Sequence, residues 1–280
     1  MASAPQYLAI VTGGAQGIGR AIVSALLEAG SKVHFLDVKV DQGNQTQKEF
    51  DKQFGIGRAK FVVCDVSDRT QLQEAFQDAK LDLGGLNVVC NNAGIFSPVF
   101  DRDRWTKVVA VNLTAAIHGT LLGLDTMSTS KGGKGGVIIN TSSIGGLRPV
   151  PHVPVYSATK FGIIGFSRSL APVSIRDNVR VNCICPDGTD TPLVAQYVAE
   201  LLPVFSIDEI QSLVAKHVYG MEMNAEKKPA DGQDLTSSLS CFLRPRVIGE
   251  EVLKLVKDGT KNGEALVISK VLGTYFQKFE

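Results

Sequence analysis

A tyrosine and a lysine stand four residues apart in the stretch VYSATK, at Tyr156 and Lys160. On a helix this spacing places both side chains on one face, one turn apart. A tyrosine with an ordinary pKa of about 10 is a weak base near neutral pH, and a cation one turn away favours the phenolate. The pair therefore predicts a proton-transfer site. With 5 tyrosines in 280 residues, chance also produces such pairs, so other motifs must support this interpretation.

Ser143 is a second residue whose position suggests chemistry. It follows the apolar run VIIN in VIINTSS and precedes Tyr156 by 13 residues. In an open α/β sheet, ligands bind outside the carboxyl ends of the strands. A hydroxyl at that edge can hold the oxygen of a substrate while a nearby base moves its proton. Ser143 is therefore predicted to lie beside Tyr156.

A glycine-rich turn, TGGAQGIG, spans residues 12–19 between a strand-like run and a helical pattern. Such a turn lets the backbone approach a pyrophosphate, which then lies on the N–H groups at the helix N-terminus. Tight packing of the turn is the alternative. The residues predicted to hold a nucleotide cofactor here are Gly13, Gln16, Gly17, Ile18 and Gly19.

Asp37 closes the second strand-like run, 18 residues after Gly19. A carboxylate there accepts hydrogen bonds from ribose hydroxyls and repels a 2′-phosphate. Gln16 and Val38 are uncharged, whereas a phosphate site favours Arg or Lys. NAD is therefore predicted rather than NADP, with Val38 also in contact. After the third run, Asp65 either meets the adenine or belongs to a helix N-cap, and its neighbours complete a predicted set of Cys64, Asp65 and Val66.

The elements that must position these residues alternate between short apolar runs and longer amphipathic segments. Seven continuously apolar runs separated by helices predict a parallel sheet covered on both faces. The expected fold is α/β: a doubly wound, seven-stranded, Rossmann-like sheet in a single domain over 1–280. The runs are YLAIVTG (7–13), KVHFLDV (32–38), AKFVVCDV (59–66), LNVVCNNAG (86–94), GGVIINTSS (135–143), VRVNCICP (179–186) and EALVISK (264–270).

The segment 192–243 interrupts this alternation. Its first part is amphipathic, and its second part, NAEKKPADGQDLTSS, is polar. Excursions after a late strand commonly cover the ligand crevice of an open α/β sheet. A helical substrate lid is therefore predicted, with a surface insertion as the alternative for the polar half.

Composition and charge exclude several classes of partner. Apolar residues make up 44% and charged residues 20% of the chain, and the net charge is +1. Neither a nucleic acid nor an anionic membrane is expected as a partner. The N-terminus, MASAPQYLAIVTGG, lacks a cationic region and a long apolar core, so neither a signal peptide nor membrane insertion is expected.

The 5 cysteines lie mostly in strand-like runs. They are predicted to be reduced and buried, which favours a cytoplasmic protein. Cys183 and Cys185 share one face of a strand, but no second cysteine pair or nearby histidine completes a ligand set. No metal is therefore expected.

Taken in order, the motifs resemble the short-chain dehydrogenase/reductase family. The resemblance rests on TGGAQGIG, Asp37, NNAG at 91–94, Asn112, Ser143 and the Tyr156/Lys160 pair. It runs from about residue 6 to 193 and resumes at the last helix and strand. It implies an NAD-dependent oxidoreductase that interconverts a secondary alcohol and a ketone.

The resemblance also implies a role for each matching residue. Tyr156 would act as general acid/base, and Ser143 would polarise the substrate oxygen. Lys160 would bind the nicotinamide ribose and lower the pKa of the tyrosine. Asn112 would support a water in a proton relay, although a structural amide bracing a helix is the alternative. The further residues implied at the cofactor are Asn91, Asn92, Ala93, Gly94, Pro186, Thr189 and Thr191.

Within the family, the sequence most resembles the prostaglandin-oxidising branch and the insect-type alcohol dehydrogenases. This implies a hydroxylated fatty acid or prostaglandin-like lipid, bound by Ser143, Val153 and Tyr156. Three departures bear on that inference: Val153 replaces a glutamine of the prostaglandin branch, Asp187 interrupts the usual Pro-Gly pair, and the polar stretch 224–240 is longer than the corresponding lid. A hydroxysteroid or terpenoid alcohol is the alternative substrate. A non-catalytic NAD sensor is the alternative from another class.

Family analogy further implies a homodimer formed through the helical segments 101–127 and 155–173. Their small and apolar residues permit close packing between two copies, or equally within one subunit.

Overall fold

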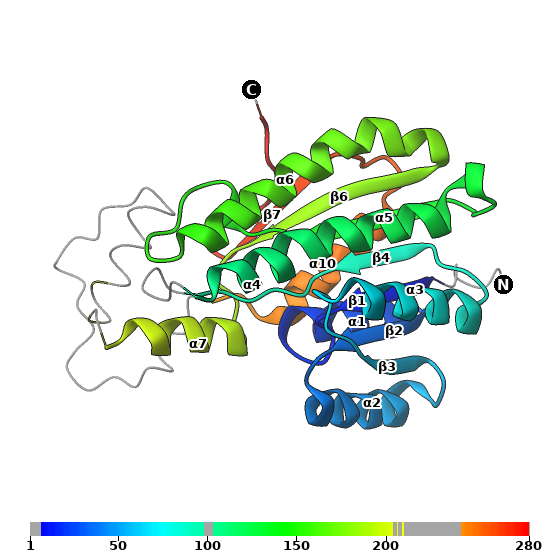
Figure 1. The fold of residues 1–280 in the computed structure, drawn as a ribbon, viewed down its shortest axis with the longest axis horizontal. Helices are drawn as coiled ribbons and strands as arrows, with labels where there is room; N and C mark the ends of the chain where they lie inside the picture. Colours follow the sequence, from blue (N-terminus) through cyan, green and yellow to red (C-terminus); the bar gives the residue numbers. More distant parts are fainter. Residues whose placement is uncertain (1–6, 98–102, 204–205, 207–208, 210–241, 280) are drawn as a thin grey trace.

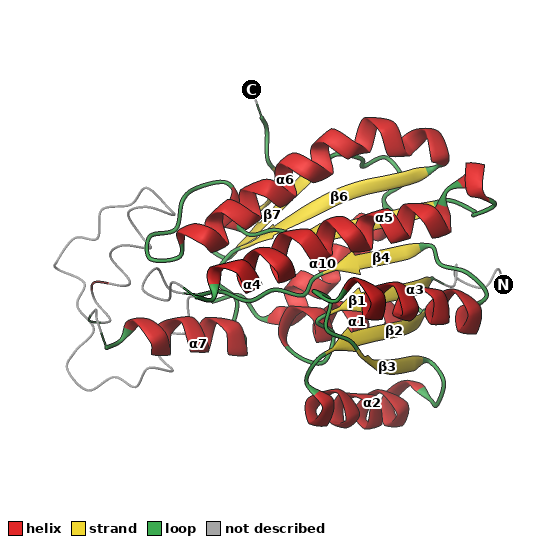
Figure 2. Ribbon diagram, viewed as in Figure 1, coloured by secondary structure: helices red, strands yellow, loops and turns green. Residues whose placement is uncertain are grey.

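One mixed sheet organises the molecule. The computed structural model describes residues 7–97, 103–203, 206, 209 and 242–279. Eight strands lie in the order β3-β2-β1-β4-β5-β6-β7-β8, as Figure 2 shows in yellow for most of them. Their bounds are β1 Leu8–Thr12, β2 Lys32–Asp37, β3 Ala59–Val63, β4 Val88–Asn91, β5 Gly136–Thr141, β6 Val179–Pro186, β7 Ala265–Ser269 and β8 Gly273–Phe276.

The predicted Rossmann-like sheet is confirmed, with one strand added. The seven predicted strands are all parallel, and β8 pairs antiparallel with β7. The apolar pattern does not predict β8, because it is a four-residue edge strand, GTYF, whose first three residues are exposed. Strand β8 forms through its hydrogen bonds to β7 and has no buried face of its own.

Helices cover both faces of the sheet (Figure 1). Helices α1, α2 and α10 contribute to the apolar cluster on one face, and α3, α5 and α6 contribute to the clusters on the other. The bounds are α1 Gly17–Glu28, α2 Val40–Phe54, α3 Arg69–Leu83, α4 Trp105–Val109, α5 Ala115–Met127, α6 Pro154–Ser174, α7 Pro192–Leu201 and α10 Pro245–Lys257.

Alternation along β1 shows how the two layers share one strand. Ala9 and Val11 belong to the cluster beside α1 and α10, whereas Ile10 belongs to the cluster beside α3 and α5. All three are fully buried, because successive strand side chains point to opposite faces and both faces are covered. Continuous apolar runs in the sequence follow directly from this arrangement.

The strand order reverses direction at β1. This strand pairs with β2 on one side and with β4 on the other, so the connections after β1 and β4 diverge. In doubly wound sheets such a switch point opens a crevice at the carboxyl ends of the strands. Helix α7 begins shortly after β6 ends and lies beyond that edge (Figure 1). Most of the predicted 192–243 lid lies outside the described residues.

One long apolar helical segment lies between β4 and β5. Within the described ranges, Trp105–Met127 has the length and the mean hydropathy, 1.4, that a membrane span needs. It consists of α4, a π-helical turn at Ala110–Thr114 and α5. Because α5 packs against α3, β4, β5 and α6, the segment has the character of a core helix.

Candidate functional site

The glycine-rich turn has a backbone that only glycine adopts easily. Gly13 and Gly17 have φ values of +66° and +56°, in the left-handed region. At Gly19 a Cβ would lie 2.0 Å from the carbonyl oxygen of Gly13 and 2.6 Å from Nδ2 of Asn92. Helix α1 starts at Gly17, so its free N–H groups face this tight turn. The turn therefore fits a pyrophosphate.

The turn is tied to the end of β4 through Thr12. Its hydroxyl accepts hydrogen bonds from the N–H groups of Asn92 (3.0 Å) and Ala93 (3.1 Å), while Asn92 Nδ2 donates to the Thr12 carbonyl oxygen (3.1 Å). These bonds join β1 and β4 at the switch point. Thr12 begins the glycine-rich motif, which by itself assigns this residue no role.

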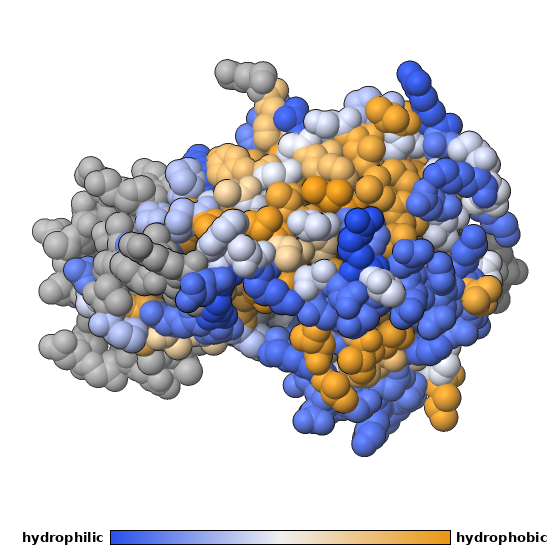
Figure 3. All heavy atoms as spheres, viewed as in Figure 1, coloured by the Kyte–Doolittle hydropathy of each residue, from blue (hydrophilic) through white to orange (hydrophobic). Residues whose placement is uncertain are grey.

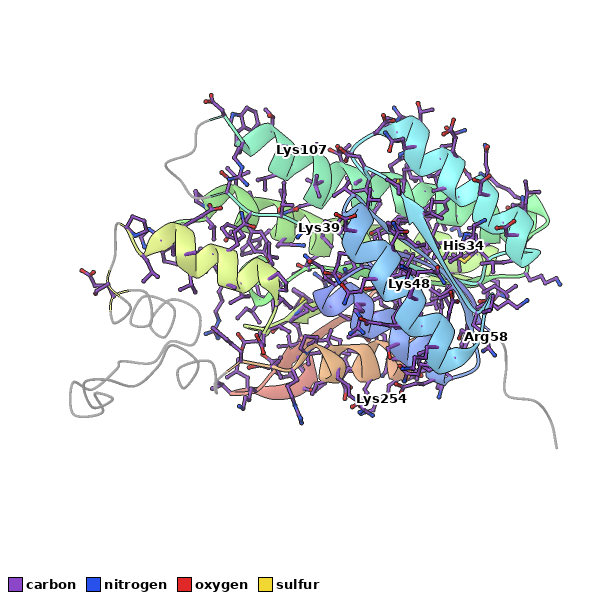
Figure 4. The ribbon with its side chains drawn as sticks, turned by 90° about the horizontal axis from the view of Figure 1, so that it is seen from below. His34, Lys39, Lys48, Arg58, Lys107 and Lys254 are labelled. Atoms are coloured by element: carbon purple, nitrogen blue, oxygen red, sulfur yellow. The ribbon has the colours of Figure 1, made fainter. Side chains whose placement is uncertain are left out.

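Asp37 lies at the end of β2, where the motif predicts it. Its Oδ2 accepts from the N–H of Ala15 and its Oδ1 from the N–H of Lys39, each at 3.1 Å. The Lys39 ammonium reaches back to donate to Oε1 of Gln16 at 3.3 Å. Lys39 therefore brings a cation to the region for which the motif indicates only the uncharged Gln16 and Val38. Figure 4 shows Lys39 at the start of α2, the blue helix.

The segment after β3, Cys64 to Val66, is held by burial and by hydrogen bonds to other residues of the chain. Cys64 is buried, and burial raises its pKa to about 12, with Asp65 and Asp68 adding to the rise. Asp65 accepts hydrogen bonds from Lys107 (2.8 Å) and Ser67. Partial burial opposes these bonds, which nevertheless hold the pKa of Asp65 below its usual value. The helix N-cap itself is Asp68.

Asn112 uses its whole amide to hold the loop after β4. Its Oδ1 accepts from the N–H of Ile95 and its Nδ2 donates to the carbonyl oxygen of Ile95, both at 2.8 Å. Nδ2 also donates to Thr159 Oγ1 at 3.3 Å. The side chain thus braces the Gly94–Ile95 loop against α6. Asn112 lies in the π-helical turn, a local widening that commonly marks functional sites.

Ser143, Tyr156 and Lys160 meet at the carboxyl ends of β5 and β6. Ser143 follows β5, while the other two lie one turn apart in α6. Lys160 Nζ lies 5.5 Å from the centroid of the Tyr156 ring and donates to the Thr141 carbonyl oxygen at 2.8 Å. Ser143 Oγ makes a long, 3.5 Å hydrogen bond to the Pro186 carbonyl oxygen. The sequence-predicted residues are therefore assembled in one place.

Burial dominates the electrostatics of this cluster. It raises the pKa of Tyr156, an effect that a hydrogen bond with Ser143 opposes and Cys185 increases. Burial also lowers the pKa of Lys160 to about 8, with Cys185 opposing. These shifts reflect burial, and the lowering of the tyrosine pKa by a charged Lys160 stays a prediction. With a pKa of about 8, Lys160 is still mostly protonated at pH 7.

The segment after β6 approaches the glycine-rich turn. The Thr189 hydroxyl donates to the Asp187 carbonyl oxygen (2.7 Å), and the Thr191 hydroxyl donates to the Thr189 carbonyl oxygen (3.2 Å). Thr191 also caps the N-terminus of α7. A Cβ on Gly17 would lie 3.2 Å from the Thr191 methyl group. Gly17 and Thr191 are therefore neighbours in the fold, although they are far apart in sequence.

On the substrate side, the described contacts join α7 to the loop after β4. The rings of Phe96 and Tyr197 meet edge to face, with centroids 5.4 Å apart. Val153 is buried directly before α6, with 3% of its surface exposed, and His152 has a left-handed backbone with φ +68°. Tyr197 has no motif signal, because its position depends on where α7 packs.

Comparison with known proteins assigns the family. Residues 7–201 match the family model described as short chain dehydrogenase. The chain is 36% identical over 275 residues to 15-hydroxyprostaglandin dehydrogenase [NAD(+)] of Mus musculus, covering 98% of this chain and 93% of that protein. The chain belongs to the short-chain dehydrogenase/reductase family. The predicted resemblance is confirmed, including the likeness to the prostaglandin branch.

Other members of the family differ in the substrates and cofactors that their names give. The human 15-hydroxyprostaglandin dehydrogenase [NAD(+)] is 36% identical over 278 residues, covering 98% of this chain and 94% of that protein. A 3beta-hydroxysteroid dehydrogenase 2 of Eggerthella lenta is 32% identical over 188 residues, covering 65% and 71%. The crystal structure of a variant actinorhodin polyketide ketoreductase with NADPH aligns at a TM-score of 0.78 and 25% identity, covering 98% and 100%.

Family membership fixes the reaction class. The chain is a short-chain dehydrogenase/reductase enzyme, an oxidoreductase acting on a small-molecule alcohol or ketone. The site described above has the parts that such chemistry needs: a phenol, a hydroxyl and an ammonium beside a glycine-rich turn at a helix N-terminus.

Proposed function

We propose that this enzyme oxidises a secondary alcohol of a hydroxylated fatty acid or prostaglandin-like lipid to the ketone, using NAD. The observation that supports the proposal is the 36% identity to a 15-hydroxyprostaglandin dehydrogenase over 98% of the chain. That coverage includes 192–243, the segment proposed to recognise the substrate. A likeness restricted to the glycine-rich turn and the reacting residues would support the reaction class without a substrate class.

The reacting residues have distinct proposed tasks. When bound, the nicotinamide cofactor accepts a hydride from the alcohol carbon. Ser143 holds the alcohol oxygen, and Tyr156 removes the hydroxyl proton. Lys160 lies 5.5 Å from the tyrosine ring centroid and, while charged, favours the phenolate that accepts this proton. Its Nζ is held in place by the Thr141 carbonyl oxygen.

Asn112 contributes to this relay through its backbone rather than its amide. Both polar atoms of the side chain already bond to Ile95. The π-helical turn changes the local pairing so that the N–H of Ala115 donates to the carbonyl oxygen of Ala110. We infer that a backbone carbonyl in this turn holds the relay water, while the amide keeps the Gly94–Ile95 loop open beside Lys160.

The cofactor preference depends on two opposite charges. Asp37 favours ribose hydroxyls, and 15-hydroxyprostaglandin dehydrogenase [NAD(+)] carries its cofactor in its name. Lys39 places an ammonium within 3.3 Å of Gln16 and offers partial neutralisation of a 2′-phosphate. The proposed enzyme therefore prefers NAD and retains measurable activity with NADP.

The remaining cofactor contacts follow the edge of the sheet. The pyrophosphate is proposed to lie on the glycine-rich turn, the adenine near the segment after β3, and the nicotinamide between the ends of β4 and β6. The corresponding residues are Gly13, Gln16, Gly17, Ile18, Gly19, Cys64, Asp65, Val66, Asn92, Ala93, Gly94, Pro186, Thr189 and Thr191.

Helix α7 is proposed as the described part of a substrate lid. It starts from Thr191, which caps it, and Tyr197 contacts Phe96 across the site. Val153 is proposed to line the pocket as an apolar residue near the start of α6. Because it offers no hydrogen bond, substrate recognition there depends on shape.

A hydroxysteroid is the second candidate substrate. It is favoured by 32% identity to the 3beta-hydroxysteroid dehydrogenase 2 of Eggerthella lenta, although that match covers 65% of this chain. The candidates share the proposed cofactor and reacting residues and differ in the lid. A non-catalytic NAD sensor has no chemical need for the assembled Tyr156, Ser143 and Lys160.

The test follows NADH formation at 340 nm with hydroxy fatty acids, prostaglandins, steroids and simple secondary alcohols. We expect turnover of the lipid alcohols by the native enzyme. Tyr156→Phe should lose activity by about 100-fold or more, because the general base is removed. Its NADH affinity should stay within about twofold, since the ring that faces Lys160 remains.

Each outcome selects one interpretation. Preferential turnover of steroids would replace the lipid proposal by the second candidate. Tight NADH binding without turnover of any alcohol would favour the sensor. Full activity in Tyr156→Phe would refute the role given to this tyrosine.

We further propose a homodimer that forms through α5 and α6. Leu121 on α5 and Phe161 and Val173 on α6 are exposed by 46%, 45% and 59%. Figure 3 shows apolar surface over these two helices. Sedimentation velocity should give about twice the 30.0 kDa chain mass. Among the described residues, four cysteines are free and buried, which fits a reducing compartment, and we propose a cytoplasmic location.

A further inference from the structure

Asp187 interrupts the usual Pro-Gly pair after β6, and its side chain has well-defined partners. Its Oδ2 accepts from the Ser269 hydroxyl at 2.6 Å, and its Oδ1 accepts from the N–H of Gly188 at 2.6 Å. Asp187 and Ser269 are 7% and 5% exposed. Short hydrogen bonds to a buried carboxylate are strong and directional. The carboxylate therefore joins the ends of two neighbouring strands, β6 and β7.

Ser269 extends this connection into the C-terminal hairpin. Its Oγ accepts from the N–H groups of Val271 (3.1 Å) and Leu272 (3.0 Å), which form the turn before β8. The hydroxyl proton is directed to Asp187. Both lone-pair directions and the proton of Ser269 are thus used. The hairpin fixes the serine, and the serine fixes the carboxylate.

On its other side, Asp187 adjoins the reacting cluster and the cofactor segment. Pro186, its predecessor, accepts the hydrogen bond of Ser143. The carbonyl oxygen of Asp187 itself accepts a hydrogen bond from the Thr189 hydroxyl. Thr189 in turn accepts from Thr191, which lies beside Gly17. A short chain of contacts therefore runs from the C-terminal hairpin to Ser143 and to the glycine-rich turn.

We propose that Asp187 and Ser269 are a pair of positioning residues that set the backbone from Pro186 to Thr191 for cofactor binding. This inference rests on the proposed function, because Thr189 and Thr191 are taken as cofactor contacts there. Neither Asp187 nor Ser269 needs to touch the cofactor. The hydrogen bond between them holds the segment that does, and the chain uses a carboxylate where a glycine would leave the segment free to move.

The test compares variants by three measurements: the Kd of NADH from fluorescence, the KM and kcat with NAD, and the midpoint of thermal unfolding. Asp187→Ala removes both acceptors and should raise the Kd of NADH and the KM of NAD about tenfold. Asp187→Asn keeps the size but turns a donor toward either Ser269 or Gly188, so it should raise both several-fold. Ser269→Ala breaks the same bond and should have a similar effect.

Two comparisons separate positioning from general stability. The double variant Asp187→Asn/Ser269→Ala should bind NADH no more weakly than either single variant, because one shared bond is lost. Thr274→Ala removes a hydroxyl from the exposed part of the same hairpin and should leave the Kd of NADH within about twofold. A purely structural role would lower the unfolding midpoint without changing the Kd.

The inference is overturned if folded Asp187→Ala and Ser269→Ala bind NADH as the native enzyme does, or if the effects of the single variants multiply in the double variant. These failures differ from failure of the proposed function. Native enzyme that binds NADH but oxidises no alcohol refutes the function, while the Kd comparison still decides the positioning pair. Native enzyme that does not bind NADH refutes both.

Discussion

Gly19 offers a sharp test of the glycine-rich turn, because no side chain fits there. In Gly19→Ala the new methyl carbon would lie 2.0 Å from the Gly13 carbonyl oxygen and 2.6 Å from Asn92 Nδ2. The first neighbour is backbone, so the turn itself must move. The second donates to the Thr12 and Gly13 carbonyl oxygens, at 3.1 and 3.4 Å, and must give up those bonds or shift with them.

The size of the effect follows from these contacts. Overpacking a close contact costs about 1–3 kcal/mol. Weakening the Asn92 hydrogen bonds adds about 1 kcal/mol. We therefore expect the free energy of unfolding to fall by about 2–4 kcal/mol. Displacement of the proposed pyrophosphate cradle should weaken NADH binding by about tenfold or more, because a hydrogen bond to a charged group contributes about 1.5–3 kcal/mol.

Urea unfolding and NADH fluorescence titration measure the two effects separately. Gly259→Ala is the matched control, because a Cβ there meets nothing within 4 Å and the residue is exposed outside the site. It should change the free energy of unfolding by less than about 0.5 kcal/mol and leave NADH binding unchanged. Folded Gly19→Ala with native NADH affinity would refute the assignment of this turn to the pyrophosphate.

Two further predictions concern charge. Lys39→Ala should lower kcat/KM for NADP several-fold and leave kcat/KM for NAD nearly unchanged. The control Lys48→Ala, farther along α2 (Figure 4), should change neither value. Equal losses with both cofactors in Lys39→Ala would contradict the role of Lys39. Burial, reinforced by Lys60, lowers the pKa of His34 from 6.5 to about 4, so the unfolded chain takes up this proton first as the pH falls. Native protein should therefore lose about 3 kcal/mol relative to His34→Leu between pH 6.5 and pH 4, measured by urea unfolding, and parallel pH curves for the two proteins would contradict it.

The sheet was predictable because its strands are buried on both faces. Ile10 and Val11 point to opposite layers and are both fully buried, so the run that contains them is continuously apolar. Strand β8 lacks this pattern, since it has one neighbour and three exposed residues. An edge strand that is held by backbone hydrogen bonds needs no particular side-chain pattern, so the sequence predicts it poorly.

The meeting of the candidate reacting residues was predictable for a different reason. Tyr156 and Lys160 lie on one helix, where a spacing of four fixes their relation, and Ser143 lies at a strand end that the fold brings to the same edge. Their pKa values were not predictable. The direction for Tyr156 depends on how much water its neighbours exclude, and burial exceeds the effect of any single partner.

Contacts between distant segments required the three-dimensional structure. Lys39 stands two residues beyond Asp37, and only the fold shows that its ammonium bonds to Gln16 on another element. Asp187 and Ser269 are 82 residues apart and meet because β6 and β7 are neighbours in the sheet.

Asp187 departs from the family pattern, and its contacts account for its charge. As a motif position, Asp187 suggests a charge placed beside the nicotinamide. In the fold, its carboxylate accepts bonds from Ser269 and Gly188, so its charge serves the backbone that precedes α7. Lys39 shows the reverse case, since a surface lysine outside the motifs bonds to Gln16 in the glycine-rich turn. The partners of a charged group, more than its place in a motif, determine what it contributes to binding.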